Sequence, residues 1–177
     1  MKNIKIMGYD HGTNFAGWAT MRNGKPIDIG IKDFTQIDMP FVLTEIYTDT
    51  FRLLEQEKPD VLVLERPVHF QNANSVIALV GAFTSVTMAA LDLNIRIEHL
   101  RPTDIKNLTG KGNADKDVVA QEMQMRFGLD YDELAVPVLY KVDSKKGRKG
   151  EVKDRLFDPS DALALCCAYN DKLRGAV

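Results

Sequence analysis

Residues 157–165 read FDPSDALAL, and the rest of the chain is organised around this stretch near its carboxyl end. The stretch places Asp158 and Asp161 three residues apart at the start of an apolar helix, where such a spacing puts both side chains on one face. Two carboxylates can bind a divalent cation, but a hard cation needs more oxygen ligands than two. We therefore expect further acids on neighbouring elements.

Two more acids end predicted strands. Asp10 closes the strand over residues 3–10, and Glu65 follows the apolar run 61–64, which is typical of a strand buried on both faces. In open α/β sheets, sites lie at the carboxyl ends of strands. Because carboxylates gathered without cations repel one another, we predict that these two acids join Asp158 and Asp161 around divalent cations.

The element order predicts the fold. Three strands come first, joined by a hairpin turn at Asn23-Gly24, and helices then alternate with two further strands. The expected strands are 3–10, 15–21, 25–34, 61–64 and 94–99; the expected helices are 43–54, 74–91, a short one from 101, 117–127 and 158–172. This order matches an RNase H-like α/β fold, a mixed five-stranded sheet with helices on both faces.

Length and composition indicate one globular domain over residues 1–177, with 45% hydrophobic and 27% charged residues. We expect no apolar run that reaches the roughly 18 residues of a membrane span, and therefore a cytoplasmic protein without a membrane partner. The adjacent Cys166 and Cys167 suit neither a disulfide with each other nor a metal site, so we interpret them as reduced core residues.

The net charge of −2 hides an uneven distribution. Residues 141–155 contain seven Lys and Arg against three acids, a net of +4, whereas the rest of the chain sums to −6. From 128 to 157 no periodicity holds, so we expect a long basic loop, and loops of this length are usually functional or disordered. The loop could contact a phosphate backbone through Lys145, Lys146, Arg148 and Lys149, or be an ordinary solvated segment.

Each acid also has a structural interpretation. Asp158 before Pro159 fits a helix N-cap, and Asp161 completes a pattern like a capping box. Asp10 alone could form a turn, and Glu65 could pair with the adjacent Arg66. The joint placement of all four acids at fitting positions in one element order favours a metal site. Such a site, with two Mg²⁺ ions, can cleave a phosphodiester.

Five segments carry a family resemblance. They are GYDHG at 8–12, GWA at 17–19, LERP at 64–67, KNLTGKGNADK at 106–116 and DPSDALA at 158–164. Together they resemble the RuvC family of Holliday-junction resolvases, and among these the phage-encoded members. The resemblance implies a homodimeric endonuclease of DNA recombination and repair. Such an enzyme nicks two strands of a four-way DNA junction symmetrically with Mg²⁺ or Mn²⁺, here in the cytoplasm of a bacterial host cell. Flaps and forks share the geometry, so other branched DNA stays open as a substrate.

The resemblance also implies roles for particular residues. The metal ligands for two ions would be Asp10, Glu65, Asp158 and Asp161. Lys116 would contact the scissile phosphate, although a solvated lysine in the first turn of a helix is the simpler interpretation. Lys106 and Lys111 would bind DNA. Helix 74–91, whose apolar stripe is wider than one contact needs, would form the dimer interface.

Three features depart from the family pattern. His11 follows the first aspartate where a proline is usual, and it could lie near the metals, carry protons or simply occupy a turn. Val68 stands where bacterial members place an aromatic residue that stacks on bases; Phe70 could substitute for it, or else junction shape governs cleavage more than sequence does. The segment 128–157 is longer and more basic than expected, so docking to a branch-migration motor is not assumed.

Two alternatives remain open at this point. The first is a monomeric RNase H-like nuclease that acts on RNA, as in ribosomal RNA maturation, against which the apolar stripe of helix 74–91 argues. The second is a nucleic-acid-binding module without catalysis. Four acids in a groove that approaches phosphate argue against it, because they would repel the ligand unless cations were bound.

Overall fold

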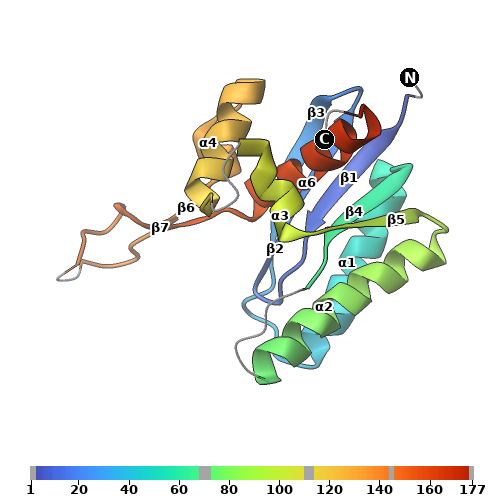
Figure 1. The fold of residues 1–177 in the computed structure, drawn as a ribbon. Helices are drawn as coiled ribbons and strands as arrows, with labels where there is room; N and C mark the ends of the chain where they lie inside the picture. The colour runs from blue at the N-terminus through green and yellow to red at the C-terminus, as the bar shows by residue number, and fades with distance from the viewer. Residues whose placement is uncertain (1–2, 68–72, 110–113, 144–145, 176–177) are drawn as a thin grey trace.

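A computed structural model describes residues 3–67, 73–109, 114–143 and 146–175 of the chain. Its centre is a mixed five-stranded sheet with the order β3-β2-β1-β4-β5, as Figure 1 shows. β1 is the central strand; it pairs antiparallel with β2 and parallel with β4. The sheet strands are β1 (Lys5–Asp10), β2 (Phe15–Arg22), β3 (Lys25–Asp33), β4 (Val61–Glu65) and β5 (Arg96–Leu100).

Helices cover both faces of this sheet (Figure 1). α1 and α2 pack on one face together with one set of buried strand residues, and α6 with α4 covers the other. The helices are α1 (Phe41–Glu57), α2 (Ala73–Asp92), α3 (Pro102–Lys106), α4 (Lys116–Phe127), α5 (Tyr131–Leu134) and α6 (Asp158–Leu173), with a 3₁₀ turn η1 (Asn107–Thr109). The expected RNase H-like fold is confirmed.

Alternation along β1 and β4 decides which face receives each side chain. On β1, Met7 and Tyr9 belong to the core beneath α1 and α2, whereas Ile6 belongs to the core beneath α6. Asp10 therefore falls on the α6 face. On β4, Leu64 lies in the α1 and α2 core, so Glu65 also falls on the α6 face. The two strands run parallel with Tyr9 opposite Leu64. Asp10 and Glu65 consequently lie side by side at the edge of the sheet.

Two glycines let α6 lie directly on the sheet. A Cβ atom at Gly8 would stand 2.0 Å from the carbonyl oxygen of Ala162, and one at Gly17 would stand 1.9 Å from that of Asp158. Gly17 is also the register partner of Asp10. The close approach that these glycines allow brings the first turn of α6 over the end of β1.

The segment 128–157 is not the loop that we expected. It contains α5 and a two-stranded antiparallel sheet of β6 (Val136–Leu139) and β7 (Val152–Leu156), which projects away from the body in Figure 1. Its strands have only four and five residues. β7 reads VKDRL, with three consecutive charged residues between Val152 and Leu156, so it lacks the alternation that identifies a strand in a sequence.

The expected N-cap at Asp158 was also wrong. α6 has its N-cap at Phe157, without a side-chain cap, and Asp158 is its first helical residue. The amide of Asp161 donates to the carbonyl of Phe157 at 2.9 Å. Since neither carboxylate is the N-cap side chain, both remain available for other contacts.

α2 is more apolar than a surface helix requires. Within the described residues, the window Ser75–Asp92 is long and apolar enough to cross a membrane by length and composition, with a mean hydropathy of 1.6, and 28% of it is buried. The expectation that no such run exists was therefore wrong, because Gly, Ser and Thr take the places that charged residues occupy in most surface helices. One side of α2 packs on α1, and the exposed side carries Ile77, Val80, Met88 and Leu91.

Candidate active site

Four acids from three elements converge at one edge of the sheet. Asp10 ends β1, Glu65 ends β4, and Asp158 and Asp161 occupy the first turn of α6. Burial, followed by the negative charge of Asp161, raises the pKa of Asp10 well above its ordinary value, and Asp158 and Glu65 act in the same direction. Each of the other three acids is thus near enough to repel the charge of Asp10.

Lys116 completes this acidic cluster, which we define as Asp10, Glu65, Asp158 and Asp161. It is the first residue of α4, whose N-cap is Asp115. A cation at this end of a helix opposes the helix dipole, but the ammonium of Lys116 lies 2.7 Å from the carboxylate of Asp161. Partial burial disfavours the charged lysine, yet Asp161 and then Asp10 raise its pKa above the ordinary value.

The ammonium of Lys116 in turn limits the rise that burial causes in the pKa of Asp10 and of Asp161. Burial raises the pKa of Asp161, and Lys116 opposes that rise. The Lys116 side chain is 62% exposed and that of Asp161 only 17%, so the ion pair sits at the surface of the cluster. The contact of Lys116 with the scissile phosphate, which the family resemblance implied, stays a prediction. In this structure the ammonium pairs with Asp161 and offsets part of the repulsion among the acids.

A small pocket opens among these side chains. Its volume is about 120 Å³, and its polar lining includes Asp10, Glu65, Lys116 and Asp161. That volume equals roughly four water molecules at about 30 Å³ each, which is room for cations with some of their waters but not for a nucleotide. Any polymer substrate must therefore approach the acids from outside the pocket.

The chemistry of the donors fits a hard divalent cation. Carboxylate oxygens are the ligands that Mg²⁺ and Mn²⁺ prefer, and the raised pKa values of Asp10 and Asp161 reflect negative charge and burial that a cation would relieve. Among the described residues, however, no three Asp, Glu, His or Cys side chains are already arranged as ligands of one ion. Metal binding would require the carboxylates to turn and Lys116 to leave Asp161.

His11 lies on the other face of the sheet. Its ring packs against Phe83 of α2 with centroids 5.3 Å apart, and Phe83 in turn packs against His99. Burial, with a smaller effect from His99, lowers the pKa of His11 to about 4, so its imidazole is neutral at pH 7. Of the three roles open to His11 from the sequence, the structure contradicts the one that placed it near the metals, because alternation along the chain turns it away from Asp10 and toward Phe83.

Several predicted DNA contacts cannot be placed. Phe70, Lys111 and Lys145 lie outside the described residues, and for Lys106 the structure describes the backbone, at the end of α3, but not the side chain. Lys146, Arg148 and Lys149 lie in the turn region between β6 and β7, where their side chains are exposed. These three stand apart from the acidic cluster, on the projecting hairpin.

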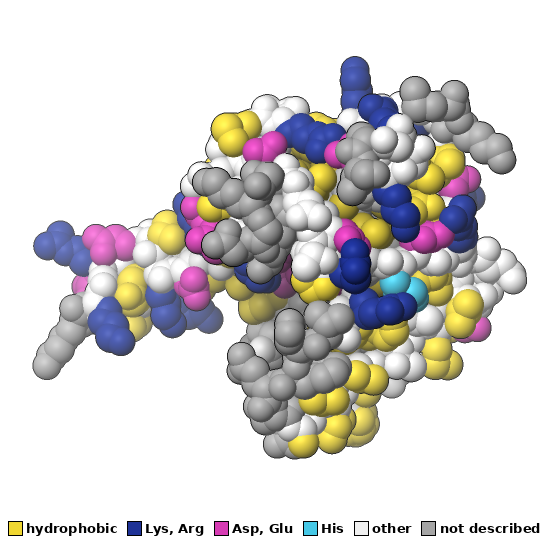
Figure 2. Space-filling view, viewed as in Figure 1, with side chains coloured by type: hydrophobic (Ala, Val, Ile, Leu, Met, Phe, Trp, Pro, Cys, Tyr) yellow, Lys and Arg dark blue, Asp and Glu magenta, His cyan; other side chains and the backbone are white. Residues whose placement is uncertain are grey.

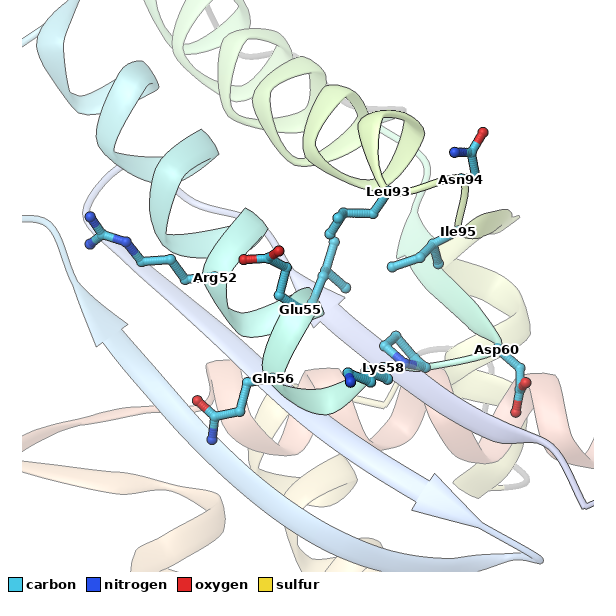
Figure 3. A pocket seen from close by; sticks show the side chains of 10 residues that line it. Arg52, Glu55, Gln56, Lys58, Asp60, Leu93, Asn94 and Ile95 are labelled. Carbon is cyan, nitrogen blue, oxygen red and sulfur yellow. The ribbon is translucent and has the colours of Figure 1, made fainter.

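A larger hollow lies elsewhere on the described surface. Figure 3 shows it between the ends of α1 and α2, with a volume of about 920 Å³ and exposed charges of both signs, among them Arg52, Lys58 and Asp60. It adjoins the starts of β4 and β5, whereas the acids follow strand ends. The five residues of β4 separate the two edges by about 16 Å at 3.3 Å per residue, so this hollow is not part of the acidic site.

Comparison with known proteins identifies the family. The family model described as "Crossover junction endodeoxyribonuclease RuvC" matches residues 6–132. The chain belongs to the RuvC family. The RuvC match includes Asp10, Glu65 and Lys116 and ends before the β6–β7 hairpin. The recognition made from the five sequence segments is confirmed, and the phage-type qualifier stays a prediction.

Individual RuvC proteins support this assignment. The chain is 33% identical over 135 residues to the crossover junction endodeoxyribonuclease RuvC of Carboxydothermus hydrogenoformans, covering 71% of this chain and 83% of that protein. It is 30% identical over 132 residues to the RuvC of Syntrophomonas wolfei, covering 71% and 77%.

Solved structures agree with the RuvC fold. Thermus thermophilus RuvC in complex with a Holliday junction substrate superposes with a TM-score of 0.72 at 18% identity, covering 98% of this chain and 96% of that one. The yeast mitochondrial Holliday junction resolvase Ydc2 superposes with a TM-score of 0.62 at 13% identity, covering 93% and 76%. At these identities the likeness establishes the fold that RuvC proteins share.

Proposed function

We propose that this chain is a metal-dependent endodeoxyribonuclease that resolves four-way DNA junctions. The observation that carries the proposal is the meeting of Asp10, Glu65, Asp158 and Asp161 at the sheet edge in a chain of the RuvC family. Acids brought together from three separate elements are costly for stability, and a hydrolytic metal centre explains why they are retained. We treat residues 1–177 as one nuclease domain.

The number and kind of ions belong to the same proposal. Mg²⁺ keeps several waters and takes one or two protein carboxylates, so four carboxylates suit two Mg²⁺ or Mn²⁺ ions better than one. When bound, such ions supply an activated water and neutralise charge on the phosphate and the leaving oxygen. The carboxylates of the cluster would hold them.

We expect Lys116, the first residue of α4, to act at the mouth of the acidic pocket. With its carboxylate engaged as a metal ligand, Asp161 would no longer hold the Lys116 ammonium, which pairs with it in this structure. The Lys116 side chain is already 62% exposed at the mouth of the pocket. There it can bind a phosphate oxygen of the incoming strand and stabilise the negative charge that develops during cleavage. The rest of the chain would orient the DNA strand and hold the four carboxylates in position.

A homodimer through α2 is the second part of the proposal. Ile77, Met88 and Leu91 are 62%, 53% and 59% exposed. In Figure 2, hydrophobic side chains gather at the lower edge of the molecule, where Figure 1 shows α2. A contiguous apolar stripe on a helix marks an interaction surface. A second copy of the chain places a second acidic cluster on the other strand of a symmetric junction, which explains paired nicks.

Charges on this stripe should separate the copies. We expect Met88→Lys with Leu91→Lys to convert a dimer at micromolar concentration into a monomer, because an interface cannot bury two unpaired ammonium groups. Sedimentation velocity measures this. The single change Ile27→Lys, at a residue 54% exposed on β3, is the matched control and should leave the dimer intact. A wild-type chain that is monomeric while it makes paired nicks would contradict the dimer proposal.

A substrate panel tests the proposed function against its alternatives. With Mg²⁺, we expect paired nicks in a four-way junction to form at least about a hundredfold faster than nicks in a linear duplex of the same sequence, and no cleavage of an RNA–DNA hybrid. Preferential cleavage of the hybrid by a monomer would favour the RNA nuclease. Binding without cleavage of any substrate would favour a silent module.

The place of action follows from the substrate. A resolvase works where cellular DNA is, and we propose the cytoplasm of a bacterial cell. An origin in a phage that infects such a cell stays a prediction.

A further inference from the structure

The β6–β7 hairpin is an arm that projects from the nuclease body (Figure 1). Its strands pair with each other and not with the central sheet. The RuvC family match ends at residue 132, before the arm begins. The arm therefore lies outside the matched region that contains Asp10, Glu65 and Lys116.

Four cations of the arm are exposed and form no ion pair within the described part of the chain. Among the described residues, none of Lys141, Arg148, Lys149 and Lys153 forms an ion pair, and all four are exposed. Figure 2 shows Lys and Arg side chains along the projecting arm. Such a group of unpaired cations is the electrostatic signature of a surface that binds phosphate.

The carboxylates of the arm accept hydrogen bonds from its own backbone amides. Asp143 accepts a hydrogen bond from the amide of Lys149 at 2.8 Å, and Glu151 accepts one from the amide of Arg148 at 2.8 Å. Asp154 accepts one from the amide of Arg155, also at 2.8 Å. All three carboxylates thus help to fix the backbone while the neighbouring basic side chains point into solvent.

The base of the arm is fastened to the active-site helices. The guanidinium of Arg155 binds the carboxylate of Asp132 and the carbonyl of Ala135, both at 2.6 Å. It also lies 4.9 Å from the centre of the Tyr131 ring. The hydroxyl of Tyr131 donates to Asp117, the residue after Lys116 on α4.

The other end of the arm leads directly into the acids. β7 ends at Leu156, and α6 begins two residues later at Asp158. The arm is therefore connected to both helices that supply active-site side chains. A preorganised arm loses less conformational entropy on binding than a loose segment would.

The length of the arm sets its reach. The extended part, β7 from Val152 to Leu156, spans about 16 Å at about 3.3 Å per residue. Arg148 lies just beyond it in a turn that is closed by the hydrogen bond from the Glu151 amide to the Arg148 carbonyl at 3.0 Å. Along one DNA strand, at about 3.4 Å per base pair, the length of β7 corresponds to about five base pairs.

We propose that the β6–β7 arm is a second DNA-binding surface, which binds the phosphate backbone of a junction arm about five base pairs from the bond that is cleaved. This inference rests on the proposed function, because it takes its substrate from there. The charge distribution of the chain favours it: residues 141–155 carry a net +4, and the rest of the chain carries −6. An acidic body repels DNA, so the arm supplies attraction that most of the body lacks.

A protein partner is the competing occupant. Leu139 and Val152 face each other across the arm and are 46% and 49% exposed. They form a small apolar pair, whereas four unpaired cations surround or flank it. A strong dependence of DNA affinity on these cations distinguishes DNA from a protein as the ligand.

The test is the salt dependence of junction binding. We expect the triple variant Arg148→Gln, Lys149→Gln, Lys153→Gln to reduce the slope of log affinity against log salt by about 2.7, from about 0.9 per phosphate contact. Its affinity would then fall about 40-fold less than that of the parent between 50 and 200 mM salt. Fluorescence anisotropy with a labelled four-way junction, in an Asp158→Asn background that keeps the DNA intact, measures this.

A second test removes the same contact from the DNA side, by replacing charged phosphates with neutral ones. Neutral methylphosphonates at positions three to eight base pairs from the crossover should weaken binding of the parent protein and leave binding of the triple variant unchanged, since both changes remove the same contact. Methylphosphonates at fifteen to twenty base pairs should affect neither protein. The proposal is wrong if the losses of affinity caused by the triple variant and by the methylphosphonates add. It is also wrong if the triple variant has the same slope of log affinity against log salt as the parent.

The protein control uses the opposite edge of the sheet. Lys25→Gln, Arg52→Gln, Lys58→Gln removes the same total charge from exposed positions, two of which line the hollow in Figure 3. An equal fall in slope for this control would mean that net charge alone acts, and would overturn the proposal. Cleavage by the parent chain is measured in parallel: binding that depends on the arm without Mg²⁺-dependent cleavage would refute the nuclease and not the arm.

Discussion

Replacing Asp10 with asparagine is expected to lower the rate of junction cleavage by about a thousandfold while making the metal-free protein more stable. Asp10 lies where burial and three other acids oppose its charge. Asparagine keeps the shape of the side chain but removes both that repulsion and the charge that a cation needs. The unfolding temperature should rise by about 2–4 °C for each kcal/mol of repulsion relieved.

The gain in stability should depend on pH. The pKa of Asp10 is higher in the folded chain than its ordinary value of 3.8, so the folded state binds the proton more tightly than the unfolded state does. Stability from this group is complete below pH 3.8 and is lost as the pH rises through the raised pKa. The advantage of Asp10→Asn is thus expected to be absent near pH 3.5 and full near pH 8, as thermal unfolding in EDTA would measure.

Divalent ions should reverse the order of stability. Mg²⁺ binds the folded wild-type chain and raises its unfolding temperature by mass action, whereas Asp10→Asn should gain much less. Asp38→Asn is the matched control, since Asp38 is exposed in the turn before α1 and its substitution should change neither cleavage nor the Mg²⁺ effect. An Asp10→Asn protein that is less stable than wild type in EDTA at pH 8 would speak against a strained acidic cluster.

Gly17→Ala should be nearly as damaging, although Gly17 carries no reactive group. Its Cβ would stand 1.9 Å from the carbonyl oxygen of Asp158 and 2.7 Å from the nitrogen of Pro159, where ordinary contacts begin at 3.4 Å. Both neighbours are backbone atoms, so the first turn of α6 must move by more than 1 Å. We expect about 1–3 kcal/mol of lost stability and a loss of about a hundredfold in cleavage rate, because Asp158 and Asp161 move with that turn.

Gly81→Ala provides the comparison. A Cβ at Gly81 would meet only the terminal methyl groups of Leu43, at 3.0 Å, and alanine is about 1 kcal/mol better than glycine inside a helix. We expect unchanged or higher stability and a normal cleavage rate. Chemical denaturation and single-turnover cleavage of both variants measure the difference, and a Gly17→Ala enzyme with normal values for both would show that α6 does not need this close contact.

Much of the fold could be predicted because its signals are local. The Asn23-Gly24 turn is a clear case: both residues adopt positive φ, at 54° and 77°, as the hairpin turn requires. The buried strand that ends at Glu65 was found from its apolar run. The position of Asp10 beside Glu65 then followed from the parallel pairing of β1 and β4.

The missed features depend on contacts between distant parts of the chain. The sequence showed Gly17 only as part of a motif, whereas its contact with Asp158 is set by how α6 packs. The pairing of Lys116 with Asp161 depends in the same way on the approach of α4 to α6. The arm was missed because its strands pair with each other and bury few side chains, so periodicity carried almost no information there.

The most direct test of the acidic cluster as a metal-dependent catalytic centre is incubation of the purified chain with a labelled mobile four-way junction and Mg²⁺, beside Asp158→Asn and beside wild type in EDTA. Asp158 is the informative position because it is neither the N-cap of α6 nor paired with Lys116, so asparagine should leave the fold unchanged. We predict paired, symmetric nicks from wild type with Mg²⁺ and none from the other two reactions. Nicks that persist in both would contradict this account.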